Sequence, residues 1–182
     1  MKKLLLHSCC APCSSAVLER LVESFNITIY YYNPNIDTKL EFMRRREELE
    51  KLSKLGINFN IITEEYVPEE YNKAVKGLEN LGEGSERCYE CYKLRLLKTA
   101  TYAKENSFDY FATTLSISPY KNSKWLSEIG NQIANKFNVN YLDENFKKKD
   151  GYKHSQELSY KLKLYKQNYC GCKYSKTESL KK

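Results

Sequence analysis

LLLHSCCAPCSSAVLERL, at residues 4–21, joins a strand pattern to a helix pattern through two adjacent cysteines. A short apolar run ends at Cys9-Cys10, and apolar residues with helical spacing follow at Ala16, Val17 and Leu21. A loop between a strand and a helix presents backbone N–H groups and the positive end of the helix dipole to its ligand. Nucleotide-binding proteins of this architecture place glycines there, whereas this chain places thiols, whose pKa the same dipole lowers. We therefore expect an anionic thiolate or a metal cluster in this loop.

The rest of the chain alternates strand and helix patterns. Strands are predicted at residues 3–6, 27–32, 57–66, 108–115 and 139–142, and helices at residues 14–24, 38–55, 68–81, 85–106, 123–137 and 153–167. No hairpin signal separates the strands, so the connections are crossovers and helices cover both faces of the sheet. The pattern predicts a doubly wound α/β fold with a mostly parallel five-stranded sheet, and ligands at the carboxyl ends of its strands.

Length and composition favour one domain over residues 1–182. The chain has 182 residues, 41% of them hydrophobic, and we find no repeat, linker or low-complexity run. No stretch approaches the roughly 20 apolar residues of a membrane span. The apolar run after the first lysines is also too short for a signal peptide, so we expect a cytoplasmic protein without a membrane partner.

Positive charge is concentrated in the lysine- and tyrosine-rich segment 146–182. This segment has eleven lysines and three acidic residues, a net charge of +8, and leaves about −1 for residues 1–145. Lysines interleaved with tyrosines suit a polyanion with exposed bases, which favours RNA over a membrane. A solvated, lysine-rich helix in a chain of biased composition is an equal alternative.

The seven cysteines form three tight groups, Cys9-Cys10-x-x-Cys13, Cys88-x-x-Cys91 and Cys170-x-Cys172. Such grouping in a cytosolic chain indicates metal or redox chemistry, and the odd number excludes a fully paired disulfide scaffold. Thiolates of the first two groups suit a [4Fe–4S] cluster or Zn²⁺. Because neighbouring side chains are expected to diverge, adjacent cysteines fit a cube better than a single zinc ion. Structural zinc stays open, and inert buried thiols are a weaker alternative.

The remaining cysteines allow different chemistry. Cys170 and Cys172 can close a strained, easily reduced disulfide across a flexible glycine, or they are two further metal ligands. Cys13 is either a ligand of a second metal or a small residue in the first turn of the helix. Arg87 and Arg95 flank the middle group and can offset the negative charge of a cluster.

Other polar residues give weaker signals. His7, at the end of the first strand, is interpreted as a hydrogen-bonded structural histidine. Asn33-Pro34-Asn35 and Thr113-Thr114 with Ser116 follow predicted strands, where turn chemistry is more common than substrate contact. Lys121 and Lys124 can meet phosphate, although lone surface lysines usually bind nothing specific.

Five segments together resemble the QueH family of epoxyqueuosine reductases. They are LLLHSCCAPCS at residues 4–14, YYYNPNI at 30–36, RCYECYKLRL at 87–96, FATTLSISPYKN at 111–122 and YKQNYCGCKYS at 165–175. The resemblance implies a fold like that of the adenine-nucleotide alpha-hydrolases (HUP-like), without the phosphate loop of ATP-using relatives. It also implies reduction of epoxyqueuosine to queuosine at the wobble position of tRNA anticodons, the last step of queuosine formation.

The same resemblance implies roles for individual residues. The [4Fe–4S] ligands fall on Cys9, Cys10, Cys88 and Cys91, and the redox-active disulfide falls on Cys170 and Cys172. Some members have Asp at the position of Cys13, in a loop associated with an additional mononuclear iron. The tRNA anticodon arm becomes the expected partner of the basic segment, with four candidate contacts, Lys121, Lys124, Lys153 and Lys166.

The implied reaction is a two-electron reduction with loss of water. An external electron donor, which no motif identifies, charges the cluster one electron at a time, and Cys170 and Cys172 either relay electrons as dithiol and disulfide or supply a proton to the leaving oxygen. A metal acting as Lewis acid lowers the barrier to C–O cleavage. Two other classes stay open. One is another iron–sulfur tRNA enzyme that transfers sulfur and uses ATP; the missing phosphate loop counts against it. The other is a zinc-stabilised RNA-binding protein without catalysis.

Overall fold

Three consecutive leucines form the centre of the sheet. In the computed structural model, which describes residues 1–180, strand β1 (Lys2–His7) lies between β2 (Phe25–Tyr31) and β4 (Tyr110–Thr113) and is parallel to both. Leu4 and Leu6 pack into the core on one face of the sheet, and Leu5 packs into the core on the other face. A run that is apolar on both faces is typical of a central parallel strand.

The edge strands are β3 (Asn60–Thr63) and β5 (Asn140–Tyr141), which complete a five-stranded sheet in the order β3-β2-β1-β4-β5. Every pair of neighbouring strands is parallel, as the sequence predicts. The order reverses between β1 and β4, and this is the point where sheets of this kind bind ligands. The loops that follow β1 and β4 therefore border the expected site.

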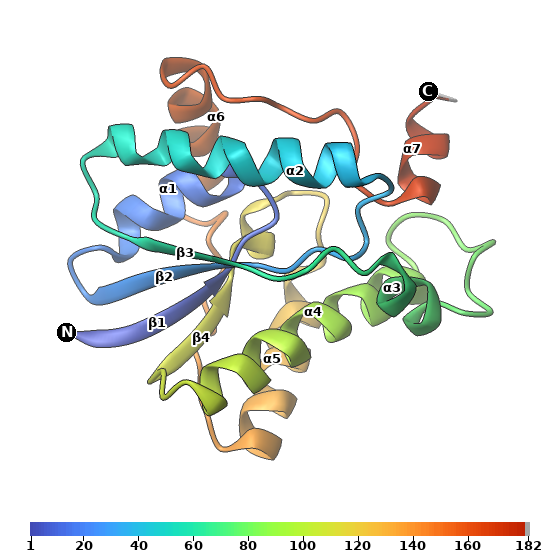
Figure 1. Cartoon of the computed structure of the whole chain (residues 1–182), viewed down its shortest axis with the longest axis horizontal. Coiled ribbons are helices and arrows are strands. Elements are labelled where there is room, and N and C mark those ends of the chain that lie inside the picture. Colours follow the sequence, from blue (N-terminus) through green and yellow to red (C-terminus); the bar gives the residue numbers. More distant parts are fainter. Residues whose placement is uncertain (181–182) are drawn as a thin grey trace.

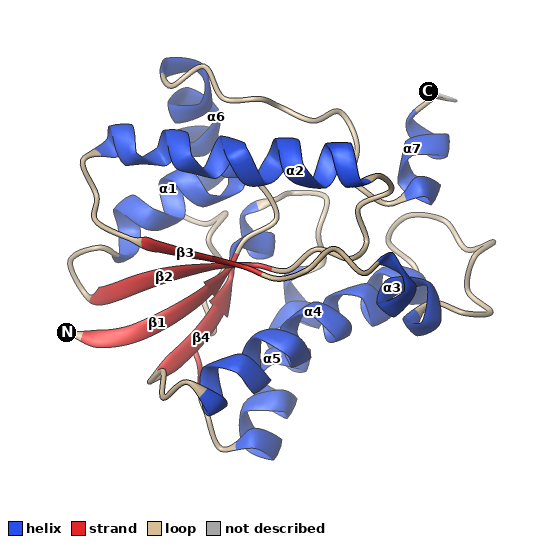
Figure 2. Ribbon diagram, viewed as in Figure 1, coloured by secondary structure: helices blue, strands red, loops and turns tan. Residues whose placement is uncertain are grey.

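Helices cover both faces of the sheet (Figures 1 and 2). One layer contains α1 (Ala11–Leu21), α2 (Lys39–Glu48), the 3-10 helix η1 (Leu49–Leu55) and α6 (Gly151–Lys161); the other contains α3 (Pro68–Ala74), α4 (Glu86–Glu105) and α5 (Ser123–Phe137). This arrangement confirms the doubly wound α/β class.

Several predicted boundaries are wrong in their details. The helix predicted over residues 38–55 divides into α2 and η1, although it ends at Gly56 in the left-handed region as expected (φ 70°). The helix predicted over 68–81 ends at Ala74, and the strand predicted over 108–115 passes into the 3-10 helix η2 (Thr114–Ile117). The last predicted helix, 153–167, ends at Lys161, because Lys163 takes a positive φ of 51° and Leu164 enters the core.

A short helix, α7 (Lys173–Ser179), follows the last cysteine and was not predicted. Its N-cap is a thiol, since the Cys172 sulfur accepts the N–H of Ser175 at 3.4 Å. Between α6 and α7 the chain runs back along α2 to the carboxyl ends of the strands (Figure 1). There the N–H of Asp37 donates to the carbonyl of Gly171 at 2.9 Å, so the C-terminal segment forms one wall of the site.

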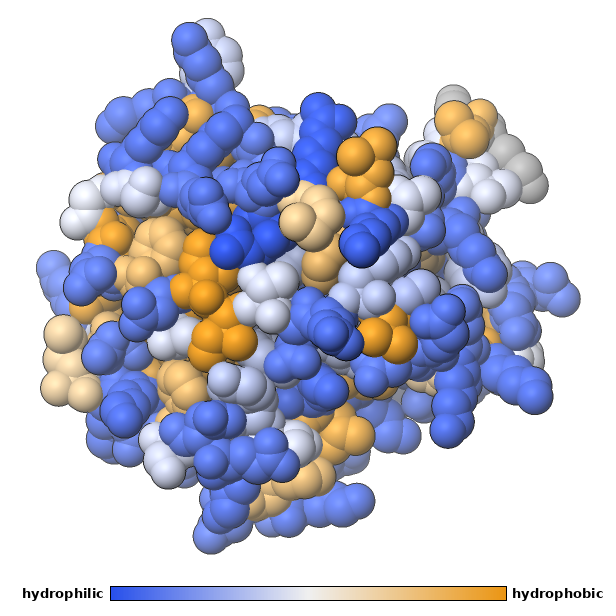
Figure 3. Space-filling view, viewed as in Figure 1, coloured by the Kyte–Doolittle hydropathy of each residue, from blue (hydrophilic) through white to orange (hydrophobic). Residues whose placement is uncertain are grey.

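The surface shows no broad apolar band on the face seen in Figure 3, where hydrophilic side chains predominate and hydrophobic ones form separate small groups. Among residues 1–180 there is no helix with the length and apolar character needed to cross a bilayer.

Candidate metal and thiol site

Three sulfurs meet in the loop between β1 and α1. The Sγ atoms of Cys9, Cys10 and Cys13 all lie within 4.8 Å of one another, and the Cys9 and Cys10 sulfurs are 3.7 Å apart. The expectation that adjacent cysteines diverge is therefore wrong here: the side chains converge where the chain turns from strand to helix, with Cys10 as the extended N-cap of α1. A single metal ion with Zn–S bonds of about 2.3 Å separates its sulfurs by about 3.8 Å. The three thiols thus suit either one ion or part of a cluster.

Buried polar contacts hold this loop. The hydroxyls of Ser8 and Ser14 are 2.5 Å apart, and the Ser14 hydroxyl also donates to the Cys10 carbonyl at 2.9 Å. The amide of Asn33 donates to the Ser8 carbonyl at 2.8 Å, so the Asn-Pro-Asn motif after β2 supports the thiol loop. These contacts fix the backbone that carries the three thiols.

His7 is a structural residue, as predicted. It is fully buried, with Nδ1 3.0 Å from the Thr113 hydroxyl and Nε2 3.1 Å from the Tyr32 carbonyl. Burial and, to a smaller extent, the charge of Arg95 lower its pKa from 6.5 to about 4. The imidazole is therefore neutral at physiological pH, and it ties the ends of β1 and β4 together.

The second thiol group opens α4. Cys88 and Cys91 are one helical turn apart, and the Cys88 sulfur accepts the N–H of Gly84 at 3.3 Å. Cys91 is buried. The guanidinium of Arg87 donates to the carbonyls of Glu79 and Leu81 and pairs with Glu178 at 3.3 Å. Arg87 therefore links α7 to the loop before α4. Its positive charge is balanced in part by Glu178 and not only by the thiols.

Arg95 lies between the three thiol groups. It is 1% exposed, its Nε donates to the Cys91 carbonyl at 3.3 Å, and its Nη2 has no hydrogen-bond partner among residues 1–180. The described part of the chain also offers it no carboxylate within ion-pairing distance. Burial lowers the pKa of Arg95, but the thiolates of Cys91, Cys170 and Cys9 raise it overall. A buried, unpaired cation requires a negative partner, so this site suits an anionic, thiolate-ligated group.

The third thiol group divides between two environments. The Cys170 sulfur is partly buried, borders the cavity described below and lies 2.9 Å from Nζ of Lys121. Cys172 is buried in a small apolar cluster with Tyr71, Val75 and Cys91. Both thiols are free in this structure. Gly171 between them has φ +134°, a conformation that L-residues rarely adopt.

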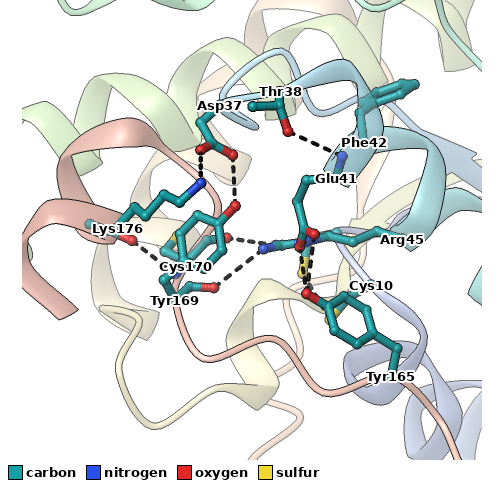
Figure 4. A network of polar contacts seen from close by, with 12 residues as sticks. Cys10, Asp37, Thr38, Glu41, Phe42, Arg45, Tyr165, Tyr169, Cys170 and Lys176 are labelled. Carbon is teal, nitrogen blue, oxygen red and sulfur yellow. Dashed lines mark hydrogen bonds and ion pairs between the residues drawn. The ribbon is translucent and has the colours of Figure 1, made fainter. Parts of the chain in front are cut away.

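A buried arginine on α2 fastens the C-terminal segment (Figure 4). Arg45 is 1% exposed, pairs with Glu41 at 2.6 Å, and donates to the carbonyls of Cys170 at 2.9 Å and Tyr169 at 3.4 Å. Nearby, Asp37 accepts the Tyr169 hydroxyl at 2.6 Å and pairs with Lys176 at 2.8 Å. Sequence reasoning missed Arg45, because a lysine- and arginine-rich helix looks solvated; its only local signal is Glu41, one turn before.

A cavity of about 590 Å³ joins the first and third thiol groups. Its walls include Cys9, Cys13, Cys170, Lys121, Lys166, Tyr120, Tyr152 and Tyr169. Tyr120 is 76% exposed at this cavity. Of the four lysines expected to contact RNA, Lys121 and Lys166 border the cavity, whereas Lys124 borders a different hollow with Asp143 and Glu144, and Lys153 is exposed on α6.

The predicted ligands are thus only partly assembled. Cys9 and Cys10 lie together with Cys13, while Cys88 and Cys91 are outside the 4.8 Å group of sulfurs. Cys9 and Cys88 nevertheless pack against the same core, between α4 and the sheet. The ligand set Cys9, Cys10, Cys88 and Cys91 stays a prediction.

Residues 4–178 match the profile of the family described as epoxyqueuosine reductase QueH. The chain belongs to the QueH family. It is 41% identical over 177 residues to the epoxyqueuosine reductase QueH of Streptococcus pyogenes serotype M1, covering 94% of this chain and 69% of that protein. It is 37% identical over 185 residues to the QueH of Thermotoga maritima, covering 100% of this chain and 94% of that protein.

Solved structures of other proteins share the fold of this QueH chain. The U34-tRNA thiolase NcsA from Methanococcus maripaludis superposes with a TM-score of 0.55 at 15% identity, over 98% of this chain and 64% of that one. A predicted subunit of tRNA methyltransferase from Methanocaldococcus jannaschii gives a TM-score of 0.53 at 16% identity, over 86% and 74% of the two chains. At these identities the likeness concerns the fold alone, and it confirms the fold class expected for the QueH family.

Proposed function

We propose that this chain is an epoxyqueuosine reductase that forms queuosine at the wobble position of tRNA anticodons. The observation that carries this function, beside the family membership, is that thiols from the two ends of the chain border one cavity. In the reaction the two C–O bonds of the epoxide break, two electrons form the C=C bond, and the oxygen leaves with two protons as water. The site must therefore deliver two electrons and two protons to a nucleoside.

The resident cofactor in this proposal is a [4Fe–4S] cluster held by Cys9, Cys10, Cys88 and Cys91, with Cys13 available to an additional mononuclear iron. The donor set fits such a group: it is rich in thiols, and the buried Arg95 guanidinium supplies an unmatched positive charge beside it. When bound, the cluster supplies single-electron transfer, and an additional iron supplies Lewis acidity.

The chain's own dithiol supplies electrons in pairs. Conversion of two thiols at Cys170 and Cys172 to a disulfide releases two electrons and two protons, which equals what the epoxide consumes. An external reductant then restores the dithiol. Gly171 gives the backbone the freedom to close and open this pair, and Arg45 holds Cys170 at the cavity through its carbonyl.

The RNA partner in this proposal is the anticodon arm. The exposed ring of Tyr120 and the rings of Tyr152 and Tyr169 offer stacking surfaces beside the cavity, and Lys166 offers charge to phosphate. The described part of the lysine- and tyrosine-rich segment, residues 146–180, returns to the thiol loop, so we propose that residues 1–182 work as one unit. The tight grouping of the seven cysteines is typical of metal and redox chemistry in a reducing compartment, so we propose the cytoplasm as its location.

The test is anaerobic purification followed by metal analysis and turnover on tRNA carrying epoxyqueuosine, with the nucleosides measured by mass spectrometry. We expect a brown protein, about four irons and four sulfides per chain, and conversion to queuosine. An iron count nearer five supports the additional site at Cys13. A colourless protein that retains one zinc and converts no epoxyqueuosine would refute the function and favour a zinc-stabilised RNA-binding protein.

A further inference from the structure

A lysine and a cysteine far apart in sequence form a close polar pair at the cavity. Nζ of Lys121 lies 2.9 Å from Sγ of Cys170, across 49 residues of chain. Lys121 belongs to the turn between η2 and α5, where its N–H donates to the Ser118 carbonyl at 3.3 Å and its carbonyl accepts from Lys147 at 3.3 Å. The turn therefore presents the ammonium to the sulfur from a fixed backbone.

No carboxylate competes for this ammonium within the described residues 1–180, where Lys121 forms no ion pair within 4.0 Å. The titratable and charged groups that act on Cys170 lie on three segments. Lys121 lies on the turn before α5, and Glu83 lies on the loop before α4. The others lie on α4 itself: Cys88, Cys91, Tyr92 and Arg95. Both nearby cations favour a negative sulfur, and Glu83 has a smaller opposing effect.

Among residues 1–180, Cys172 has no lysine or arginine within hydrogen-bonding distance of its sulfur. The sulfur accepts the N–H of Ser175 at 3.4 Å and lies beside the Tyr71 hydroxyl, and the side chain packs with Tyr71 and Val75 outside the cavity walls. The charge of Arg87 also acts on Cys172, but this guanidinium is shared with Glu178, with which it pairs at 3.3 Å. The two thiols of the Cys-Gly-Cys pair are therefore electrostatically unequal.

We propose that Lys121 is a positioning residue that holds Cys170 as the reactive thiolate of the pair, with Cys172 as the thiol that closes the disulfide. The balance of charges agrees with the geometry: burial raises the pKa of Cys170, but Lys121 and Arg95 lower it overall. Burial lowers the pKa of Lys121, and the charges of Cys170 and Tyr92 raise it overall. This role is an alternative to the RNA phosphate contact that the sequence predicts for Lys121, and that contact stays a prediction.

The redox step is balanced with this assignment. A Cys170 thiolate and a Cys172 thiol become a disulfide by forming one S–S bond, losing one proton and two electrons. The epoxide takes up those electrons and that proton together with a second proton from water. The use of Cys170 and Cys172 as the reductant rests on the proposed function, whereas the ion pair between Lys121 and Cys170 does not.

The experiment measures alkylation of individual cysteines in the anaerobic, cluster-loaded protein. Iodoacetamide is added at a series of values from about pH 5.5 to about pH 9.5, which brackets the ordinary thiol pKa, and mass spectrometry quantifies modified Cys170 and Cys172. The variants are Lys121→Met, which removes the charge at similar volume, and Lys121→Arg, which keeps it. Lys104→Met, at the exposed end of α4, is the matched control.

In the wild type we expect Cys170 to react faster than Cys172. The pH midpoint of the alkylation rate of Cys170 should lie below the ordinary thiol pKa. Lys121→Met should raise that midpoint by about one pH unit or more, which slows alkylation below the midpoint by about tenfold. Lys121→Arg should restore most of the rate, and Lys104→Met should leave it unchanged. A loss of packing alone would not be rescued by arginine or appear as a shift in the pH profile.

Two results would overturn the proposal: an unchanged midpoint in Lys121→Met, or faster reaction of Cys172 than of Cys170 in the wild type. The second comparison needs no variant, so it holds even if Lys121→Met fails to fold. Neither measurement depends on turnover. Absence of reductase activity would therefore refute the proposed function without removing the ion pair, and an unchanged midpoint would refute the pair without affecting the reductase.

Discussion

Replacing Gly171 by alanine should detach the C-terminal segment from the site. Gly171 has φ +134°, and an added Cβ would lie 3.1 Å from Nη1 of Arg45, 3.3 Å from Cγ1 of Ile36 and 3.4 Å from Nδ2 of Asn35. The backbone conformation disfavours any L-residue, and the close contacts prevent relief by a simple shift. Arg45 cannot move without losing its hydrogen bond to Cys170.

The free-energy cost of Gly171→Ala has two contributions, the disfavoured backbone conformation and the close contacts of the added Cβ. A backbone held in such a region costs of order 1–3 kcal/mol, and the close contacts add roughly 1 kcal/mol. A total of about 2 kcal/mol or more corresponds to about a 30-fold rise in the population of the opened segment. The strain acts on this segment because polar contacts, including those of Arg45 and Asp37, fasten it to α2 and the preceding loop.

Hydrogen exchange at single amides measures this opening. The N–H of Asp37 donates to the Gly171 carbonyl, and the N–H of Cys170 donates to the Ser175 hydroxyl at 2.9 Å. We expect Gly171→Ala to speed exchange at both amides about 30-fold and to leave the amides of β1 unchanged. Gly56→Ala is the control, since Gly56 also has a positive φ but has nothing within 4 Å of the added Cβ. Unchanged exchange at Asp37 and Cys170 would refute this reasoning.

Three further outcomes are expected. Serine at Cys170 or Cys172 should abolish turnover and leave the cluster absorbance intact; a fall in iron content would instead make these residues ligands. Arg95→Met removes a buried positive charge beside the thiols, so the bound cluster should become harder to reduce, and a potentiometric titration giving an unchanged or higher potential would contradict this. Burial raises the pKa of Asp37, but Lys176 and Tyr169 lower it overall below its ordinary 3.8. Docking of the C-terminal segment should thus be at full strength above about pH 4 and weaken as the pH falls through the lowered pKa. Asp37→Asn should remove this pH dependence of docking. The rate of proteolytic cleavage near Lys176 at each pH measures it.

Local patterns determined most of the fold. The triple leucine of β1, the turn residues after β2 and the helical spacing of α4 and α5 each depend on neighbours within a few residues, so periodicity predicts them. The parallel sheet then followed, because strands that alternate with helices require crossovers. The spacing of the cysteines also carried the chemistry, since thiols in such tight groups are typical of metal and redox sites. What periodicity missed were features with a tertiary cause: α6 stops early because Leu164 joins the core, and α7 begins on the thiol of Cys172.

Partners between distant segments were decided by the tertiary structure alone. Nothing near Lys121 in the sequence indicates Cys170, and apart from Glu41 nothing near Arg45 indicates that its guanidinium is buried and bound to the Cys170 carbonyl. Both contacts arise because the C-terminal segment folds back to the carboxyl ends of the strands, where it meets α2, which follows β2, and the turn after η2, which follows β4. The number of residues between two positions in the sequence does not show whether they meet in the fold. Where they do meet, burial strengthens the charge interaction between them. The sequence alone thus determined which chemical groups the protein has, and the folded structure decided which of them act on one another.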